Sequence, residues 1–467
     1  MEETVRTQYE WLRKLDAVCD LFIGLIGSGV KTMADVDMPA FLQQVPEYHA
    51  SLAPEGYPEL FAASLKEKNR QAMYDNCVAM KQYLQDLFAN MEQGKPLAYY
   101  FVTMTPEILL GMDLAPVCFE LVPVFLSAVF RRGVEEEMDL LELKGLPPHL
   151  CSAQKGTVTA IEIGRMPMPD VLVKPSTPCD SSSMLYQYVM ERNNVPLVVL
   201  DAPYYSNQRA FKYYHDEWKR MVERLEKLTG HTLDEDLLRK HVEYGNQQLW
   251  YVYEMQKMRR AVPNPDSSMH RAFDVGALYQ CGVNSKYVDY LRTCYEQTKA
   301  RYDKGIGCLP EGKKEIRTLW TWGITPFYLD MYDWLEEDFG MTYIECAGGY
   351  LPGDIVGLVN TSSVESMIEG LAWRSFNMPM ARNVMSFSDI WINDFVKLAK
   401  TYHADAAVFS GHMACKHSWG VNKLLSDALQ EEVGIPTFQW ETDIVDARFT
   451  PRESAHDQLA EFFNNIQ

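Results

Sequence analysis

Hydrophobic positions in residues 1–95 recur at the spacing of an α-helix. The stretches Glu3–Ile26 and Leu65–Met91 are long and of mixed polarity, and apolar side chains such as Met73 and Cys77 lie one turn apart in the second. No short alternating or continuous apolar run typical of a strand interrupts them. The pattern therefore predicts a helical N-terminal region.

From Leu97 onward, short apolar runs alternate with amphipathic stretches. The expected strands are Leu97–Val102, Asp170–Lys174, Pro196–Leu200, Thr318–Thr321, Thr342–Cys346, Ala406–Ser410 and Pro436–Trp440. The expected helices are Asp180–Arg192, Gln208–Leu228, a long helix ending near Arg260, Lys286–Arg301, Pro326–Phe339, Ser363–Trp373, Ser388–Tyr402, Trp419–Glu432 and Arg452–Asn464. Strands that alternate with helices at this spacing predict βαβ units and parallel sheets.

Three local signals refine these boundaries. Thr105 before Pro106 predicts a helix whose cap is the threonine and whose first position is the proline. Thr232–Glu235 has the spacing of a capping box that opens the long helix. The very apolar segment Leu109–Phe130 is interrupted by acids and prolines, so it is interpreted as buried core.

The pattern as a whole predicts an α/β protein with two parallel-sheet units of Rossmann or flavodoxin type. The expected regions are a helical N-terminal region (1–95), a first α/β domain (96–230), a helical connector (231–312) and a second α/β domain (313–467). A glycine-bearing polar hinge at 305–312 ends the connector.

Composition narrows the function classes. The 467 residues include 64 Asp and Glu against 44 Lys and Arg, a net charge of −20, which argues against nucleic-acid binding because such surfaces need clustered cations. The acidic start of the chain lacks a signal-peptide core, and no stretch has the length and apolarity of a membrane span. We therefore expect a cytoplasmic protein without a membrane partner. A local basic pocket for a phosphorylated small molecule stays compatible with this charge.

Two of the ten cysteines directly follow predicted strands. Cys179 follows 170–174 and Cys415 follows 406–410, and each precedes a predicted helix, where ligands bind in open α/β sheets. Backbone N–H groups at a helix N-terminus are expected to lower the pKa of such a thiol and favour the metal-binding thiolate. Cys151 follows a Gly-Leu-Pro-Pro loop and is expected to open another helix.

Other interpretations of these cysteines compete. Most cysteines in an intracellular protein are small buried hydrophobes, and the spacings here match no local iron–sulfur or zinc signature. His412 and His417 flank Cys415, so a zinc site, as in a zinc hydrolase, is one alternative. Weaker signals are the strand end at 321–327, typical of backbone close to a ligand or of a tight turn, and Asp443 after the last strand. The sequence contains no GxGxxG, Walker A, GxSxG or HExxH motif.

Several segments, taken in order, resemble one enzyme family. They are Thr103-Met-Thr-Pro-Glu-Ile-Leu-Leu-Gly-Met-Asp-Leu-Ala-Pro116, Cys151-Ser152, Ser176-Thr-Pro-Cys-Asp180, Leu319-Trp-Thr-Trp-Gly-Ile-Thr-Pro326, Cys415 and the tail from Ile435-Pro436 through Glu441-Thr-Asp443 to Phe462. Together, over roughly 96–465, they resemble the 2-hydroxyacyl-CoA dehydratase and benzoyl-CoA reductase family, and specifically a cluster-bearing subunit. The longer N-terminal region and the weakly basic tail at 452–457 depart from the family pattern.

The resemblance implies a 4Fe–4S cluster held by Cys151, Cys179 and Cys415, with one iron open. It also implies a homologous second subunit in a heterodimer, an ATP-dependent iron–sulfur activator protein and an acyl-CoA substrate. In this family one electron converts the thioester into a ketyl radical anion, and an (R)-2-hydroxyacyl-CoA reversibly loses water to give the 2-enoyl-CoA. The electron is then returned.

The resemblance further places Thr103 beside the open iron and Glu107 as a polar contact in the active cavity. A strand-end hydroxyl and a first-turn acid stabilised by the helix dipole are the structural alternatives for these two residues. The length favours the larger subunit and 2-hydroxyglutaryl-CoA as substrate, with a flavin in the complex left open. The alternatives are a benzoyl-CoA reductase-like subunit and a non-catalytic α/β binding or scaffold subunit.

Overall fold

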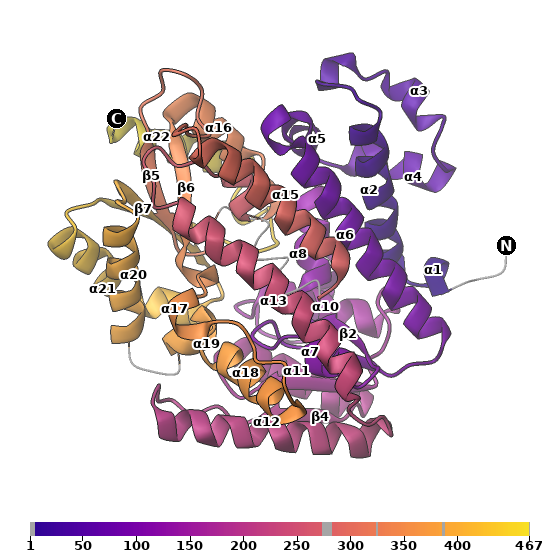
Figure 1. Cartoon of the computed structure of the whole chain (residues 1–467). Coiled ribbons are helices and arrows are strands. Elements are labelled where there is room, and N and C mark those ends of the chain that lie inside the picture. Colours follow the sequence, from indigo (N-terminus) through magenta and orange to yellow (C-terminus); the bar gives the residue numbers. More distant parts are fainter. Residues whose placement is uncertain (1–4, 273–282, 324–325, 385–387, 467) are drawn as a thin grey trace.

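The computed structural model of the chain describes residues 5–272, 283–323, 326–384 and 388–466, and it contains two four-stranded parallel sheets surrounded by helices (Figure 1). The predicted α/β class with two parallel-sheet units is confirmed. No helix in the described ranges combines the length and apolarity needed to cross a membrane. The division into four regions stays a prediction.

The first sheet has the strand order β2-β1-β3-β4. Its strands are β1 (Leu97–Tyr100), β2 (Ala115–Cys118), β3 (Val171–Pro175) and β4 (Leu197–Leu200). Every residue of β1, β2 and β3 is buried, which explains why these segments read as continuous apolar runs. Only the edge strand β4 alternates between buried and exposed positions.

The second sheet repeats this arrangement with the order β6-β5-β7-β8. Its strands are β5 (Ile316–Trp320), β6 (Met341–Cys346), β7 (Ala406–His412) and β8 (Thr437–Thr442). Within each unit, the second strand lies on one side of the first and the third strand lies on the other. The order in which strands are added to the sheet therefore reverses between β1 and β3 and between β5 and β7. Open α/β sheets bind ligands at such switch points.

Helices form the N-terminal region and the connector, as predicted. The N-terminal elements are α1 (Val5–Gln8), α2 (Glu10–Gly27), η1 (Met33–Asp35), α3 (Met38–Leu42), α4 (Glu47–Leu52), η2 (Ala53–Glu55), α5 (Pro58–Leu65) and α6 (Glu67–Glu92). The connector contains α13 (Glu235–Met258) and α15 (Ser285–Tyr302). The helices α6, α15 and α13 pack side by side and form a diagonal layer between the two units (Figure 1).

The remaining helices cover the two sheets. In the first unit they are α7 (Glu107–Gly111), α8 (Leu121–Val129), α9 (Glu135–Leu143), α10 (Ser152–Glu162), α11 (Asp180–Asn193) and α12 (Gln208–Thr229). In the second they are η3 (Pro326–Tyr328), α16 (Met331–Phe339), η4 (Ala347–Gly349), α17 (Gly353–Val356), α18 (Val364–Phe376), α19 (Pro379–Val384), α20 (Asp389–Thr401), α21 (Lys416–Glu432) and α22 (Arg452–Asn465).

Two apolar cores hold these layers together. The larger core runs through the N-terminal helices, the first sheet, the connector and one face of the second sheet, where Trp320 and Tyr343 belong to it. The smaller core lies on the opposite face of the second sheet, where Leu319 and Ile344 pack against α20 and α21. Consecutive strand residues thus enter different cores, because side chains alternate across a strand.

Two predictions about helix starts are wrong, and one strand was not predicted. The segment Leu109–Phe130 is mostly buried, as expected, but it also contains the strand β2. Pro106 is the cap residue of α7 instead of its first position, and no side chain caps this helix. The cap of α13 is Asp234, whose carboxylate accepts the backbone N–H of Leu237, instead of a capping box that begins at Thr232.

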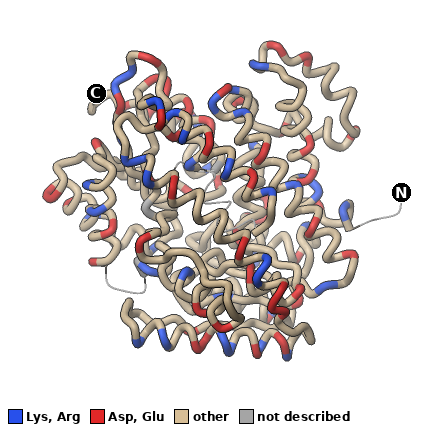
Figure 2. The backbone as a smooth tube through the Cα atoms, in the orientation of Figure 1, with Lys and Arg blue, Asp and Glu red and all other residues tan. Residues whose placement is uncertain are grey.

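Charged residues of both signs are interspersed along the helices in the view of Figure 2, and this view shows no face that is mainly basic. The distribution agrees with the net charge of −20.

Candidate functional site

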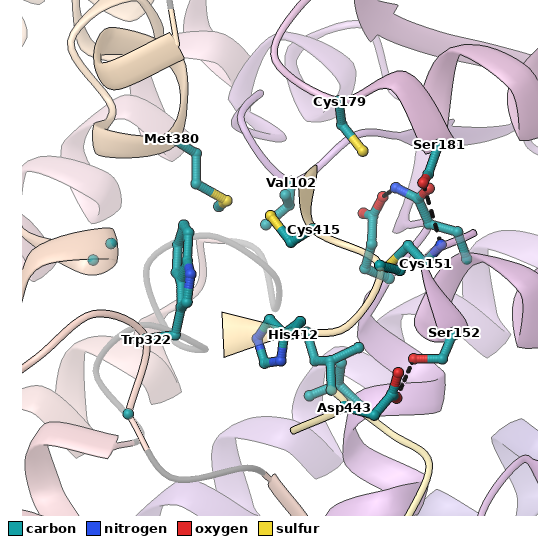
Figure 3. Close-up of a pocket in the computed structure, with 18 of the residues that line it drawn as sticks. Val102, Cys151, Ser152, Cys179, Ser181, Trp322, Met380, His412, Cys415 and Asp443 are labelled. Atoms are coloured by element: carbon teal, nitrogen blue, oxygen red, sulfur yellow. Dashed lines mark hydrogen bonds between the residues drawn. The ribbon is translucent and has the colours of Figure 1, made fainter. Parts of the chain in front are cut away.

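Residues at the carboxyl ends of both sheets line one shared pocket (Figure 3). Residues that follow both central strands of each sheet line it: Val102 and Cys179 after β1 and β3, and Trp322 and Cys415 after β5 and β7. Asp443, directly after β8, also lines it. The switch points of both sheets therefore open into the same cavity, as the rule for open α/β sheets predicts.

The three candidate cysteines come together in this pocket. Cys151, Cys179 and Cys415 all line it, and each is the residue that directly precedes a helix, namely α10, α11 and α21. The expectation that Cys151 opens a helix is confirmed. Although 236 positions separate Cys179 from Cys415, their side chains face a common space in Figure 3. The structure thus assembles the set, and ligation by these residues stays a prediction.

Polar contacts hold the three helix N-termini together. The backbone N–H of Cys151 donates to Ser181 Oγ at 3.2 Å, which ties α10 to α11. Asp180 and Lys416, the first residues of α11 and α21, form an ion pair at 2.6 Å. Ser152 donates to the buried carboxylate of Asp443 and thereby joins the first unit to the second. Asp443 therefore orients its neighbours, whereas Glu441, on the preceding strand β8, is exposed.

Burial decides the acidity of these thiols. It raises the pKa of Cys179 to about 11, although the Ser182 N–H donates to its sulfur at 3.4 Å. It also raises the pKa of Cys151, next to the Cys179 thiol, and that of Cys415. Backbone N–H groups at the helix N-termini do lower the three pKa values, as predicted, but loss of hydration outweighs this contribution in the protein without a bound cation.

The donor set has the chemistry of a soft metal centre. Three thiolate donors suit zinc or iron–sulfur ligation, and a bound cation would deprotonate them despite their burial. Among the described residues, no group of three or more His, Cys, Asp or Glu lies close enough to hold one metal ion. An iron–sulfur cluster on these residues therefore stays a prediction.

The two histidines of the zinc alternative, His412 and His417, both line the pocket. His412, at the end of β7, is half-buried, stacks on Trp322 with ring centroids 6.5 Å apart and lies near Asp443. Burial lowers the pKa of both His412 and His417. The strand end at 321–327 lies at the pocket: Trp322 lines it, and Gly323 takes a φ of +99° beside Tyr332.

Sequence reasoning missed Glu120, a buried carboxyl in the same pocket. Glu120 lies two residues beyond β2 and is 6% exposed. Its carboxylate accepts Gln154 Nε2 at 2.8 Å and Cys118 Sγ at 3.5 Å. Burial raises its pKa to about 7, a value suited to proton exchange near neutrality. Recognition of β2 would have placed this acid at a strand end.

Thr103 and Glu107 lie behind the pocket. Neither is among its lining residues, and both are buried. Glu107 forms an ion pair with Arg374 of α18 and closely approaches Gly245 of α13. The backbone carbonyl of Thr103 accepts Ser375 Oγ at 2.9 Å, and its own hydroxyl has no hydrogen-bond partner among the described residues. These contacts link the first unit to α18.

Comparison with known proteins places this architecture in a family. A family model described as 2-hydroxyglutaryl-CoA dehydratase, D-component, matches residues 101–466. The chain belongs to this family. The resemblance predicted from the sequence is thereby confirmed over residues 101–466, whereas the helical N-terminal region and the strand β1 precede the match.

Individual relatives are distant. The chain is 20% identical over 360 residues to the (R)-phenyllactyl-CoA dehydratase alpha subunit of Clostridium sporogenes, which covers 73% of this chain and 82% of that protein. It is 31% identical over 75 residues to (R)-2-hydroxyglutaryl-CoA dehydratase, subunit alpha, of Acidaminococcus fermentans, and this match spans 15% of the chain and 16% of the relative. The names of these relatives cover two different acyl groups.

Proposed function

We propose that this chain is the iron–sulfur subunit of a 2-hydroxyacyl-CoA dehydratase, a hydro-lyase that works through a ketyl radical. The observation that carries the proposal is the gathering of Cys151, Cys179 and Cys415, from three separate helix N-termini, on one pocket of a dehydratase-family chain. The substrate class is an (R)-2-hydroxyacyl-CoA, of which the 2-hydroxyglutaryl thioester in the family description is one member.

Different residues of the pocket would hold the cluster and exclude water. When bound, a 4Fe–4S cluster on three thiolates supplies one-electron chemistry at an iron without a protein ligand. Cys151, Cys179 and Cys415 would hold it, and the Ser182 N–H reduces the charge on the Cys179 sulfur. The apolar lining around them keeps water away from the thioester.

Glu120 is the group in this pocket that we assign to proton transfer. The overall change removes a hydroxyl from C2 and a proton from C3, which form water, and leaves a C2–C3 double bond. The Glu120 carboxylate would take the C3 proton, because it is buried in the pocket and its pKa of about 7 leaves much of it ionised at neutral pH. Gln154, which lies about one helical turn after Cys151, holds this carboxylate in place through a hydrogen bond.

The proposal includes the assembly around the chain. Both relatives are named alpha subunits, which supports a heterodimer with a homologous second subunit. An ATP-dependent iron–sulfur activator would deliver the electron, and a flavin elsewhere in the complex is an open element of the proposal. An oxygen-sensitive cluster fits a cytoplasmic, anaerobic setting such as amino-acid fermentation. The nine described cysteines are all free, which fits a reducing compartment.

The test is turnover by the complete complex. The chain, copurified anaerobically with its partner subunit, should convert a 2-hydroxyacyl-CoA into the 2-enoyl-CoA only when activator and ATP are present. Cys179→Ala should abolish this conversion. Reduction of benzoyl-CoA without dehydration would indicate the reductase alternative instead. Full activity of the Cys179→Ala complex would indicate a scaffold subunit, and either result would overturn the proposal.

A further inference from the structure

The pocket has two unlike walls (Figure 3). One carries the three cysteines together with Ser152 and Asp443. The other is formed by apolar and aromatic side chains, with Trp322 and Met380 facing the cysteines across the cavity. Trp391 continues this second wall, its ring 6.2 Å from that of Trp322 and at an angle of 72°. A substrate bound at the cysteines therefore extends its other end toward rings and a thioether.

Positive charge is scarce along this lining. Among the described residues that line the pocket, Lys416 is the single Lys or Arg, and its Nζ is paired with Asp180 at 2.6 Å. The lining also carries the carboxyl groups of Glu120 and Asp443. The segments outside the description (1–4, 273–282, 324–325, 385–387 and 467) contain no Lys or Arg in their sequence.

Cations just behind the lining already have partners. Arg271, next to the lining residue Ala272, binds the buried carboxylate of Glu345. The buried Lys174 donates to Ser183 Oγ at 2.8 Å, and its charge interacts with the Glu120 carboxyl and the Cys179 thiol of the lining.

The remaining basic groups also lie beside charged neighbours. Arg382, on the same helix as Met380, pairs with Asp394 at 3.0 Å. Of the two imidazoles in the lining, His412 lies beside Asp443, and His417 lies beside Asp180 and Lys416.

We propose that the pocket selects 2-hydroxyacyl-CoA thioesters whose acyl side chain is uncharged and apolar, aromatic or aliphatic, and rejects those that end in a carboxylate. This inference rests on the proposed dehydratase function and narrows its substrate class. A buried carboxylate without a cation loses its hydration and gains repulsion from the acidic groups on the lining. An apolar group gains contact area and ring stacking against Trp322 and Trp391. The 2-hydroxyglutaryl group favoured by the resemblance is thereby disfavoured.

The first experiment compares substrates in the unmodified complex. With partner subunit, activator and ATP, kcat/KM for phenyllactyl-CoA and for 2-hydroxyhexanoyl-CoA should exceed that for 2-hydroxyglutaryl-CoA by at least about 100-fold. Equal values, or preference for the glutaryl thioester, would overturn the inference and leave the proposed function intact. Failure of all three thioesters in a complex with full iron content would overturn the proposed function.

The second experiment measures binding and needs no turnover. Calorimetric titration of the complex with the products cinnamoyl-CoA and glutaconyl-CoA should show the same preference for the apolar acyl group. Met380→Arg introduces a cation into the apolar wall and should shift the ratio of the two affinities by at least about tenfold toward glutaconyl-CoA. Met380→Leu, the matched control, should keep the original ratio. Tighter binding of glutaconyl-CoA by the unmodified complex would overturn the inference whether or not the variants fold.

Discussion

The two sheets have the same strand order and meet at one pocket, yet they bring different chemistry to it. The first unit contributes two of the three cysteines, Cys151 and Cys179, together with the buried acid Glu120. The second contributes Cys415 and the aromatic wall that includes Trp322. The repeated topology therefore determines only where the site lies. The residues after each strand set its function, as expected when function is carried by loops on a scaffold.

Neither unit holds the complete site, so the site depends on the contacts between the units. One contact is the fully buried ion pair of Glu107 with Arg374. Another is the exposed pair of Arg448 with Asp139 at 2.9 Å. The predictions below concern the contribution of each unit to cluster binding, stability and turnover, beginning with the largest expected effect.

Loss of one cysteine from either unit should remove the cluster. Cys179→Ser in the first unit and Cys415→Ser in the second should each lower activity at least about 10³-fold, because both thiolates bind the same group. Anaerobic iron analysis and turnover measure this. Cys77→Ser is the control, because Cys77 is buried on the N-terminal helix α6 and does not line the pocket. This variant should keep its iron and its activity. Retention of iron and activity by one of the two variants would show that the units do not share a cluster.

Breaking the buried link between the units should cost stability. Glu107→Gln leaves the Arg374 guanidinium buried without its counter-ion and should lower the free energy of unfolding by about 3–5 kcal/mol. Anaerobic urea unfolding measures this, and the double variant Glu107→Met/Arg374→Met should recover most of the loss. A stable Glu107→Gln protein without activity would instead indicate that Glu107 acts in catalysis.

Removal of the acid on the first unit should affect turnover and leave the cluster in place. Glu120→Gln should lower kcat/KM by about 100-fold with iron content unchanged. In the unmodified enzyme kcat/KM should rise with pH and level off above about 7, because burial raises the pKa of the Glu120 carboxyl to about 7 and only the carboxylate accepts a proton. This rise should vanish in the variant.

The control is Glu217→Gln, which changes a carboxyl that is also 6% exposed but lies outside the pocket. It should keep both the rate and the pH profile. An unchanged pH profile in Glu120→Gln would exclude Glu120 as the base.

The exposed link between the units should matter least. Both side chains of the Arg448–Asp139 pair are about half exposed, so Arg448→Gln should lower the free energy of unfolding by less than about 1 kcal/mol. Urea unfolding at two salt concentrations measures this. A loss comparable to that of Glu107→Gln would show that surface contacts contribute as much as the buried pair to joining the units.

Much of the fold could be predicted from the sequence, because buried parallel strands such as β3 and capped helices such as α12 carry strong local patterns. The strand β2 was not predicted, since it is only four residues long, contains a proline and lies within the very apolar segment 109–130. Glu120 was missed with it. The positions of Cys179 and Cys415 at strand ends were predictable. Their raised pKa values were not, because burial in the pocket depends on packing between distant segments.

The aromatic wall also required the structure. Trp322, Met380 and Trp391 come from three separate segments, and nothing local in the sequence shows that they face the cysteines. Glu107 illustrates the converse case. Its place in a family-like motif indicated a role in the cavity, whereas the structure pairs it with Arg374, 267 positions away.

The most direct test of the central claim is iron and sulfide analysis of the anaerobically purified, unmodified chain. The account predicts about four irons and about four inorganic sulfides per chain, a brown colour and loss of that colour in air. A colourless protein after anaerobic reconstitution, or one that binds a single zinc and no sulfide, would contradict it.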